Sequence, residues 1–261
     1  MNYKRREFLK LSGSYASTAL VAGIAGKDML SSFFDNEPKK LKSFGLQLWT
    51  LRADLPKDPQ GILKQVASFG YKQIESFEGA KGMFWGMSNT EFKKYLDDLG
   101  MTIISSHCNI NKDFEKKADE AAAIGMKYLM CPYLGAQKTI DAYKEKADLF
   151  NKCGEIAKKA GIRFGYHNHD YSFKPMDGVM PQDVMMQATD PSLVDYEMDI
   201  FWVVAAGQDP EEWIKKYPNR FTAGHVKDKT KNTDKISSCI VGEGSIDFKK
   251  ILKTAKKNGM K

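Results

Sequence analysis

Short apolar runs alternate with longer amphipathic stretches from about residue 44 onward, and this alternation restricts the fold more than any other feature of the sequence. The apolar runs have the length of buried strands, and the amphipathic stretches have the length and periodicity of helices. Repeated strand and helix pairs indicate a parallel sheet with crossover helices, which places the chain in the α/β class.

Seven strand and helix pairs are expected, each about 30 residues long, which is the unit size of a barrel. The predicted strands are 44–49, 71–77, 101–107, 127–132, 162–167, 194–199 and 221–226. The predicted helices are 59–69, 88–99, 113–124, 139–160 and 181–188, then helical turns up to 217, and 247–258. This regularity favours a TIM-type (β/α)8 barrel over a doubly wound sheet, whose glycine-rich phosphate turn is missing after the first strand.

The last three residues, Gly259-Met260-Lys261, repeat a pattern that leads into two earlier strands. Gly100-Met101 precedes the third strand, and Gly125-Met126-Lys127 precedes the fourth. We therefore expect an eighth strand to follow position 261. The expectation is a barrel that lacks its eighth strand here, in a shortened version of a longer natural chain.

Residues 1–42 resemble an export signal followed by a linker. Arg5 and Arg6 precede Phe8, Leu9 and Lys10, and an apolar stretch follows over 16–25. This order matches a twin-arginine signal, and the apolar stretch is too short to span a bilayer comfortably. We expect an exported, periplasmic protein without a stable membrane anchor, with the barrel over residues 43–261.

The positive charge of the chain does not indicate a nucleic-acid partner. The formal net charge is +7, but residues 1–42 hold eight basic and four acidic residues, which leaves 32 basic against 29 acidic residues elsewhere. No basic stripe remains for phosphate binding. The four cysteines show no metal-binding spacing, and Cys108 and Cys131, which fall in apolar strand-like segments, are expected in the core.

All four histidines follow apolar, strand-like runs: His107, His167, His169 and His225. The carboxyl ends of barrel strands form the functional face, so these imidazoles should converge there. Glu75 and Asp199 lie on predicted strands, and a buried carboxylate needs a partner or a metal. Imidazole and carboxylate are common ligands of divalent ions, so we expect one such ion, with Mn, Co, Mg and Zn left open.

Four motifs resemble the sugar phosphate isomerase/epimerase group, which has a xylose isomerase-like TIM barrel and is related to inosose dehydratases, ketose 3-epimerases and type IV apurinic endonucleases. They are YHNHDYSF (166–173), DIFW (199–202), GHVKDK (224–229) and VGEGSID (241–247). The resemblance covers the chain from about residue 44. It is specific for the superfamily but not for one reaction.

The resemblance implies roles for particular residues. The metal ligands would be His167, Asp199 and His225, and the candidate bases are His167, His169 and Lys227. The predicted substrate-binding residues are Glu75, His107, Trp202, Asp228 and Glu243. Ketose epimerases have a glutamate at the position of His167 and a second one on the eighth strand, which would lie beyond position 261, so the resemblance does not establish their two-glutamate proton shuttle here.

Our leading hypothesis is a metal-dependent isomerase or epimerase that removes a proton next to the carbonyl of a sugar or ketosugar. A lyase or dehydratase acting on a 3-keto-sugar or glycoside begins in the same way and is a close rival. A nuclease is disfavoured by the weak charge and by Trp202, where the nuclease branch has a histidine. The last alternative is an exported, non-catalytic sugar-binding barrel, in which aromatic residues such as Trp49 and Tyr171 would stack on sugar rings. The expected partner is a small sugar, and a homo-oligomer stays open.

Overall fold

The computed structural model describes residues 44–231 and 236–260. The predicted export signal and linker, residues 1–42, lie outside the described residues, so export stays a prediction. None of the helices in the described ranges is both long enough and apolar enough to cross a membrane.

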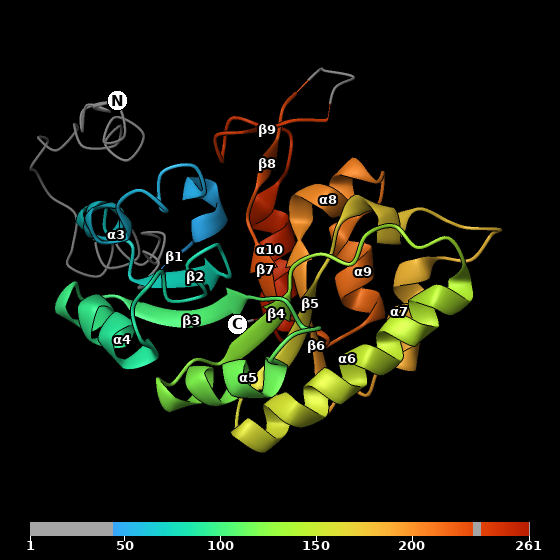
Figure 1. The fold of residues 1–261 in the computed structure, drawn as a ribbon. Helices are drawn as coiled ribbons and strands as arrows, with labels where there is room; N and C mark the ends of the chain where they lie inside the picture. Colours follow the sequence, from blue (N-terminus) through green and yellow to red (C-terminus); the bar gives the residue numbers. More distant parts are fainter. Residues whose placement is uncertain (1–43, 232–235, 261) are drawn as a thin grey trace, which may run out of the picture. The chain divides into compact units, whose positions relative to one another are not determined.

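Seven parallel strands form one curled sheet, in which each strand pairs with the next along the chain (Figure 1). The strands are β1 Gly45–Gln47, β2 Gln73–Phe77, β3 Thr102–His107, β4 Tyr128–Cys131, β5 Arg163–His167, β6 Val194–Asp199 and β7 Phe221–His225. Sequential, all-parallel order is the topology of a TIM-type barrel, so the predicted fold class is confirmed. Within the described residues, β1 and β7 lie at the two ends of the sheet.

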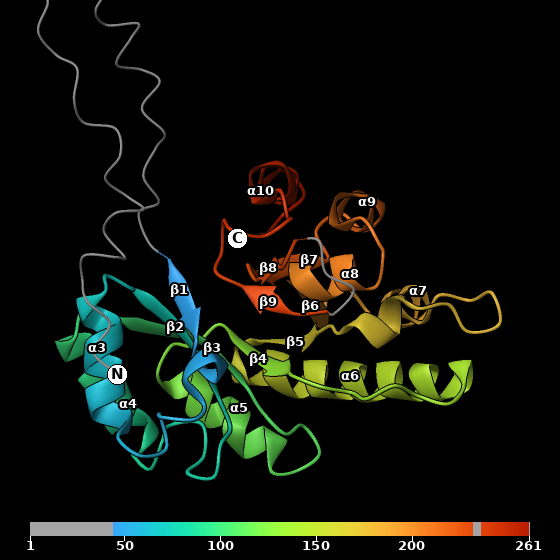
Figure 2. The same cartoon turned by 90° about the horizontal axis from the view of Figure 1, so that it is seen from above.

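The connecting helices cover the outer face of the curled sheet, as Figure 2 shows for α3 to α6. They are α3 Pro59–Ser68, α4 Asn89–Asp98, α5 Phe114–Ala123, α6 Ile140–Ala160, α7 Pro181–Ala188, α8 Ile200–Ala205, α9 Pro210–Lys216 and α10 Phe248–Lys257. The capping box predicted for the second helix is present, because Ser88 accepts from the backbone of Glu91 and Glu91 accepts in return. Apolar side chains between the helices and the sheet form one continuous core.

The first strand is shorter than predicted. After β1, the residues Leu48–Leu51 form the 3-10 helix η1, because the side chain of Gln47 accepts a hydrogen bond from the backbone N–H of Trp49. A second 3-10 helix, η2, spans Asp170–Phe173. The chain after β7 adds a small hairpin of β8 Asp228–Lys229 and β9 Ser238–Cys239, which the sequence pattern did not indicate.

The register of the sheet places the polar strand ends beside one another. Phe77 pairs with His107, and His167 pairs with Glu197. Asp199 pairs with His225. Because parallel strands end on the same edge, these pairings bring the last residues of β3, β5, β6 and β7 to one face.

Close packing of α6 on the chain before β6 depends on Gly154. A Cβ at this position would lie 2.7 Å from the carbonyl oxygen of Leu193. We predict that Gly154→Ala lowers the free energy of unfolding by about 1–3 kcal/mol through overpacking, although alanine favours helix. Chemical denaturation measures the change, and Lys152→Ala on the exposed face of α6 is the control. A stabilised Gly154→Ala variant would contradict this contact.

Candidate metal centre and active site

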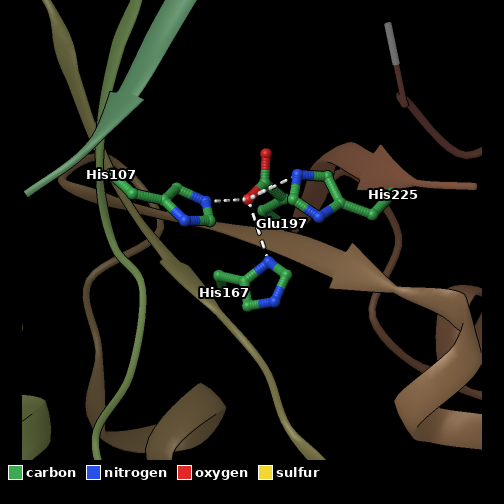
Figure 3. Close-up of side chains that lie close together, drawn as sticks. All are labelled: His107, His167, Glu197 and His225. Atoms are coloured by element: carbon green, nitrogen blue, oxygen red, sulfur yellow. Dashed lines mark hydrogen bonds and ion pairs between the residues drawn. The ribbon is translucent and has the colours of Figure 1, made fainter. Parts of the chain in front are cut away.

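Three histidines and one glutamate from four strands point at a common centre (Figure 3). One carboxylate oxygen of Glu197, Oε2, lies 2.9 Å from His107 Nε2, 3.1 Å from His167 Nδ1 and 3.3 Å from His225 Nε2. The four donor atoms all lie within 4.8 Å of one another. We call these four residues the central cluster.

A second carboxylate, that of Glu75 on β2, borders the central cluster. Its Oε1 lies 2.7 Å from His225 Nε2 and 3.1 Å from His107 Nε2. Gln47 donates to the same oxygen at 2.9 Å, and the hydroxyl of Ser105 donates to Oε2. Both Glu75 oxygens therefore have protein partners, which is what a buried carboxylate requires.

The two carboxylates and the imidazoles shift one another's pKa values. Burial and Glu197 raise the pKa of Glu75, but His107 and His225 outweigh them and hold it at about 2. Burial lowers the pKa of His107, and the two carboxylates reverse this and raise it to about 9. Likewise the pKa of Glu197 lies well below its usual value and that of His225 well above. Burial lowers the pKa of His167 to about 3, so this ring is neutral.

The donor set of the central cluster fits a divalent metal ion. Two anionic carboxylates are balanced by the protonated rings of His107 and His225, and a divalent cation can replace those two protons without changing the net charge. Ligands about 2.0–2.2 Å from a tetrahedral ion lie roughly 3.3 Å apart. The distances from Glu197 Oε2 to the three imidazole nitrogens span 2.9 to 3.3 Å. Glu197 Oε2 would move slightly away from the nearest nitrogens to admit the ion, while donor pairs that lie as much as 4.8 Å apart would approach one another.

Asp199 ends β6 at the edge of the central cluster. Its Oδ2 lies 3.7 Å from His167 Nε2, and its Oδ1 accepts from the backbone N–H of Phe201 and caps α8. Burial raises the pKa of Asp199. The buried side chain of Asn168 donates to the backbone carbonyl of Asp199 and accepts from its N–H, which fixes the ends of β5 and β6 side by side. The ligand role predicted for Asp199 stays a prediction.

His169, Trp202 and Lys227 form the next layer toward solvent. The His169 ring lies 5.2 Å from His167 and 5.3 Å from Trp202 between ring centroids. Burial and the charge of Lys227 lower the pKa of His169 to about 4. Its buried Nδ1 has no hydrogen-bond partner among the described residues. Lys227 Nζ lies 4.7 Å from the Trp202 centroid. The structure thus brings these three predicted residues together.

Two predicted substrate-binding residues, Asp228 and Glu243, do not belong to the central cluster. Asp228 is fully buried, and its carboxylate accepts from the backbone N–H groups of Lys229, Gly242, Gly244 and Ile246. It therefore clamps the loop after β9 and has little capacity left for a ligand. Glu243 is exposed on that loop.

Glu197 is the residue that sequence reasoning missed. The available signal was the alternation of Asp195, Glu197 and Asp199 on β6, since residues two apart on a strand share a face. Asp195 pairs with Arg163 at the other end of the same face. Asp199 begins the DIFW motif, whereas Glu197 belongs to none of the four motifs.

The pKa values predict how stability of the metal-free protein changes with pH. The pKa of His107 is raised from 6.5 to about 9, so its stabilising charge is present below pH 6.5 and lost as the pH rises through 9. We expect the melting temperature, measured in a chelator, to fall over this range. His107→Gln, which cannot titrate, should flatten the fall, and His225 accounts for the remainder. An unchanged slope in His107→Gln would contradict the charge assignment, and Lys152→Ala controls for surface effects.

Solved structures and curated proteins resemble this chain to different extents. A sugar phosphate isomerase/epimerase from Parabacteroides distasonis ATCC 8503 is 30% identical, with a TM-score of 0.73 over 85% of this chain and 88% of that chain. An inosose dehydratase from Clostridium tetani is 30% identical over 138 residues, 46% of this chain and 45% of the relative. The chain thus spans less than half the length of that relative. A structure of the IolI protein with a bound zinc atom is 16% identical with a TM-score of 0.65, which is a likeness of fold.

The family model described as xylose isomerase-like TIM barrel matches residues 63–261. This range includes six of the seven strands and every residue of the central cluster. The chain belongs to the xylose isomerase-like TIM barrel family.

Proposed function

We propose that this protein is a metal-dependent enzyme that removes a proton next to the carbonyl of a sugar or ketosugar. The observation that carries this proposal is the convergence of three imidazole nitrogens on one oxygen of Glu197, at the strand ends where barrel enzymes bind substrate. The zinc atom in the IolI structure supports a metal in this fold.

His107, His167, Glu197 and His225 would hold the ion. A divalent cation supplies Lewis-acid polarisation of carbonyl and hydroxyl oxygens. Glu75 stays outside this set, because its two oxygens accept from Gln47 and Ser105. Its Oε1 lies 3.1 Å from His107 Nε2 and 2.7 Å from His225 Nε2, the nitrogens that would bind the ion, so these two contacts belong to the metal-free protein and would be given up when the ion binds.

The proton-moving groups would come from the layer around the central cluster. Asp199 is a buried carboxylate whose raised pKa makes it a stronger base than an ordinary aspartate. His169 is neutral and can accept a hydrogen bond or a proton from substrate through its ring nitrogens. The ammonium of Lys227 makes no ion pair within 4.0 Å among the described residues, although its charge partly offsets the rise that burial causes in the pKa of Asp199, and it can stabilise negative charge on a substrate oxygen.

Two outcomes of this first step have separate support. The Parabacteroides distasonis structure is titled a sugar phosphate isomerase/epimerase. This favours return of the proton either to the neighbouring carbon or to the opposite face of the same carbon. The curated relatives are inosose dehydratases, which favours loss of a β-hydroxyl or glycosidic group. Isomerisation or epimerisation is our first proposal and elimination the second.

The ligand assignment predicts different effects for two acidic residues of β6. Glu197→Gln should lower affinity for Mn²⁺ or Zn²⁺ by tenfold or more, since substitution even of residues that only support the ligands lowers metal affinity about tenfold. Asp199→Asn should retain most of the metal and lose turnover. Metal content after dialysis and isothermal titration measure the first effect. The reverse pattern, with metal lost in Asp199→Asn and kept in Glu197→Gln, would restore Asp199 as the ligand.

The reaction itself is testable in D₂O. We expect the metal-loaded protein to introduce deuterium next to the carbonyl of at least one member of a panel of ketoses and 3-keto-glycosides, detected by NMR and mass spectrometry. An isomer of otherwise equal mass indicates isomerisation or epimerisation, and a product lighter by water or by an aglycone indicates elimination. Sugar binding that survives EDTA, with no exchange in any substrate, would instead support a non-catalytic sugar-binding barrel.

A further inference from the structure

An aromatic residue lies unusually open at the carboxyl end of the sheet. Tyr133 follows β4, and 63% of its surface is exposed. Its phenol hydroxyl has no hydrogen-bond partner among the described residues. A large aromatic side chain left open beside a candidate active site is a common feature of surfaces that stack against ligand rings.

Tyr133 continues a set of rings that begins at the central cluster. Its centroid lies 5.1 Å from that of His169, and the two rings are nearly perpendicular. The Tyr133 centroid also lies 5.7 Å from Tyr171, again edge to face. His169 and Tyr171 are nearly parallel, 5.8 Å apart, and Trp202 lies on another side of His169. We call Tyr133, His169, Tyr171 and Trp202 the aromatic wall.

The aromatic wall is held in place before any ligand binds. The hydroxyl of Tyr171 accepts hydrogen bonds from the backbone N–H groups of Leu134 and Gly135, at 3.0 and 3.1 Å. These bonds tie the loop after β4 to the chain after β5. Because the loop is fixed, Tyr133 can contact a ligand without first losing backbone freedom, and such preorganisation strengthens binding.

One cation, the ammonium of Lys227, lies beside the aromatic wall. Lys227 Nζ lies 4.2 Å from the Phe201 centroid and 4.7 Å from that of Trp202. Two aromatic faces hold the ammonium in place, and within 4.0 Å it makes no ion pair among the described residues, although its charge also acts on Asp199. Its N–H groups therefore remain available to ring or glycosidic oxygens of a ligand.

We propose that the aromatic wall is a subsite for the second ring of a glycoside, so that the substrate is a keto-sugar joined to another sugar or to an aromatic aglycone. The proposal rests on the proposed function only for the position of the first ring, at the central cluster. His169 contacts both His167 and Tyr133, so the wall begins one imidazole ring away from the central cluster. A second ring bonded to the first reaches it without displacing the first.

The composition of the wall favours an uncharged ring over a sugar phosphate. Phosphate sites in proteins combine several donors, such as an arginine fork or a helix N-terminus. Among the described residues, Lys227 is the one cation in contact with the rings of the wall or with Phe201. The exposed ring of Tyr133 and the partly buried rings beside it, with a single ammonium, match the C–H faces and oxygens of a neutral sugar or aryl ring.

Binding by the full, Zn²⁺-loaded chain tests the proposal without requiring turnover. The probes are glucose, cellobiose, phenyl β-D-glucopyranoside and glucose 6-phosphate, followed by NMR titration. We expect the two-ring ligands to bind about three- to tenfold more tightly than glucose, the range expected for one added aromatic contact. Tyr133→Ala should abolish this preference, and Tyr133→Phe should keep it.

The matched control is Phe69→Ala, which removes an aromatic ring of similar exposure, 54%. Phe69 lies at the end of α3 and precedes the amino end of β2, whereas Tyr133 follows the carboxyl end of β4. It should leave the preference unchanged. Equal binding of glucose and the two-ring ligands, a preference for glucose 6-phosphate, or a preference that survives Tyr133→Ala would overturn the proposal. These readings stand even if no deuterium exchange is found, so failure of the subsite and failure of the proposed reaction are distinguishable.

Discussion

Two carboxylates buried side by side, those of Glu75 and Glu197, are the constraint on which the rest of the candidate site depends. Neither can be buried as an unpaired anion, because removing a charge from water costs several kcal/mol. The imidazoles of His107 and His225 compensate both at once, at 2.7 to 3.3 Å. A divalent ion offers the same compensation. Either form would satisfy both carboxylates, so the same cluster could be buried in the folded protein with or without a metal ion.

The backbone around the cluster is fixed by side chains that take no part in it. Asn168 joins the ends of β5 and β6 through two hydrogen bonds to Asp199, and the Asp228 carboxylate closes the loop after β9. At Gly244 a Cβ would lie 2.1 Å from Asp228 Oδ1, so only glycine lets the loop approach this carboxylate. Binding geometry at the strand ends thus relies on buried polar groups that are fully hydrogen-bonded.

Two groups of residues in the site differ in burial and in the chemistry that they offer. The central cluster is nearly closed to solvent and concentrates charge, and in the proposed function the surrounding layer of Asp199, His169 and Lys227 would supply the groups that exchange protons. Removal of a proton next to a carbonyl is common to isomerisation, epimerisation and elimination. Which product forms then depends on the leaving group and on the groups facing the second carbon, and these belong to substrate recognition.

The sequence by itself determined the α/β class, the strand order and most helix bounds, because hydrophobic periodicity and caps are local properties. It also placed the histidines at strand ends. It missed η1 and the β8–β9 hairpin, where local hydrogen bonds override the apolar pattern. Only the tertiary structure singled out Glu197 and the wall around Tyr133, and only it showed that Glu75, already expected at the site, contacts His225. Their significance comes from register and sheet curvature, which bring residues more than 100 positions apart, such as Glu75 and His225, into contact, and no local pattern encodes that distance.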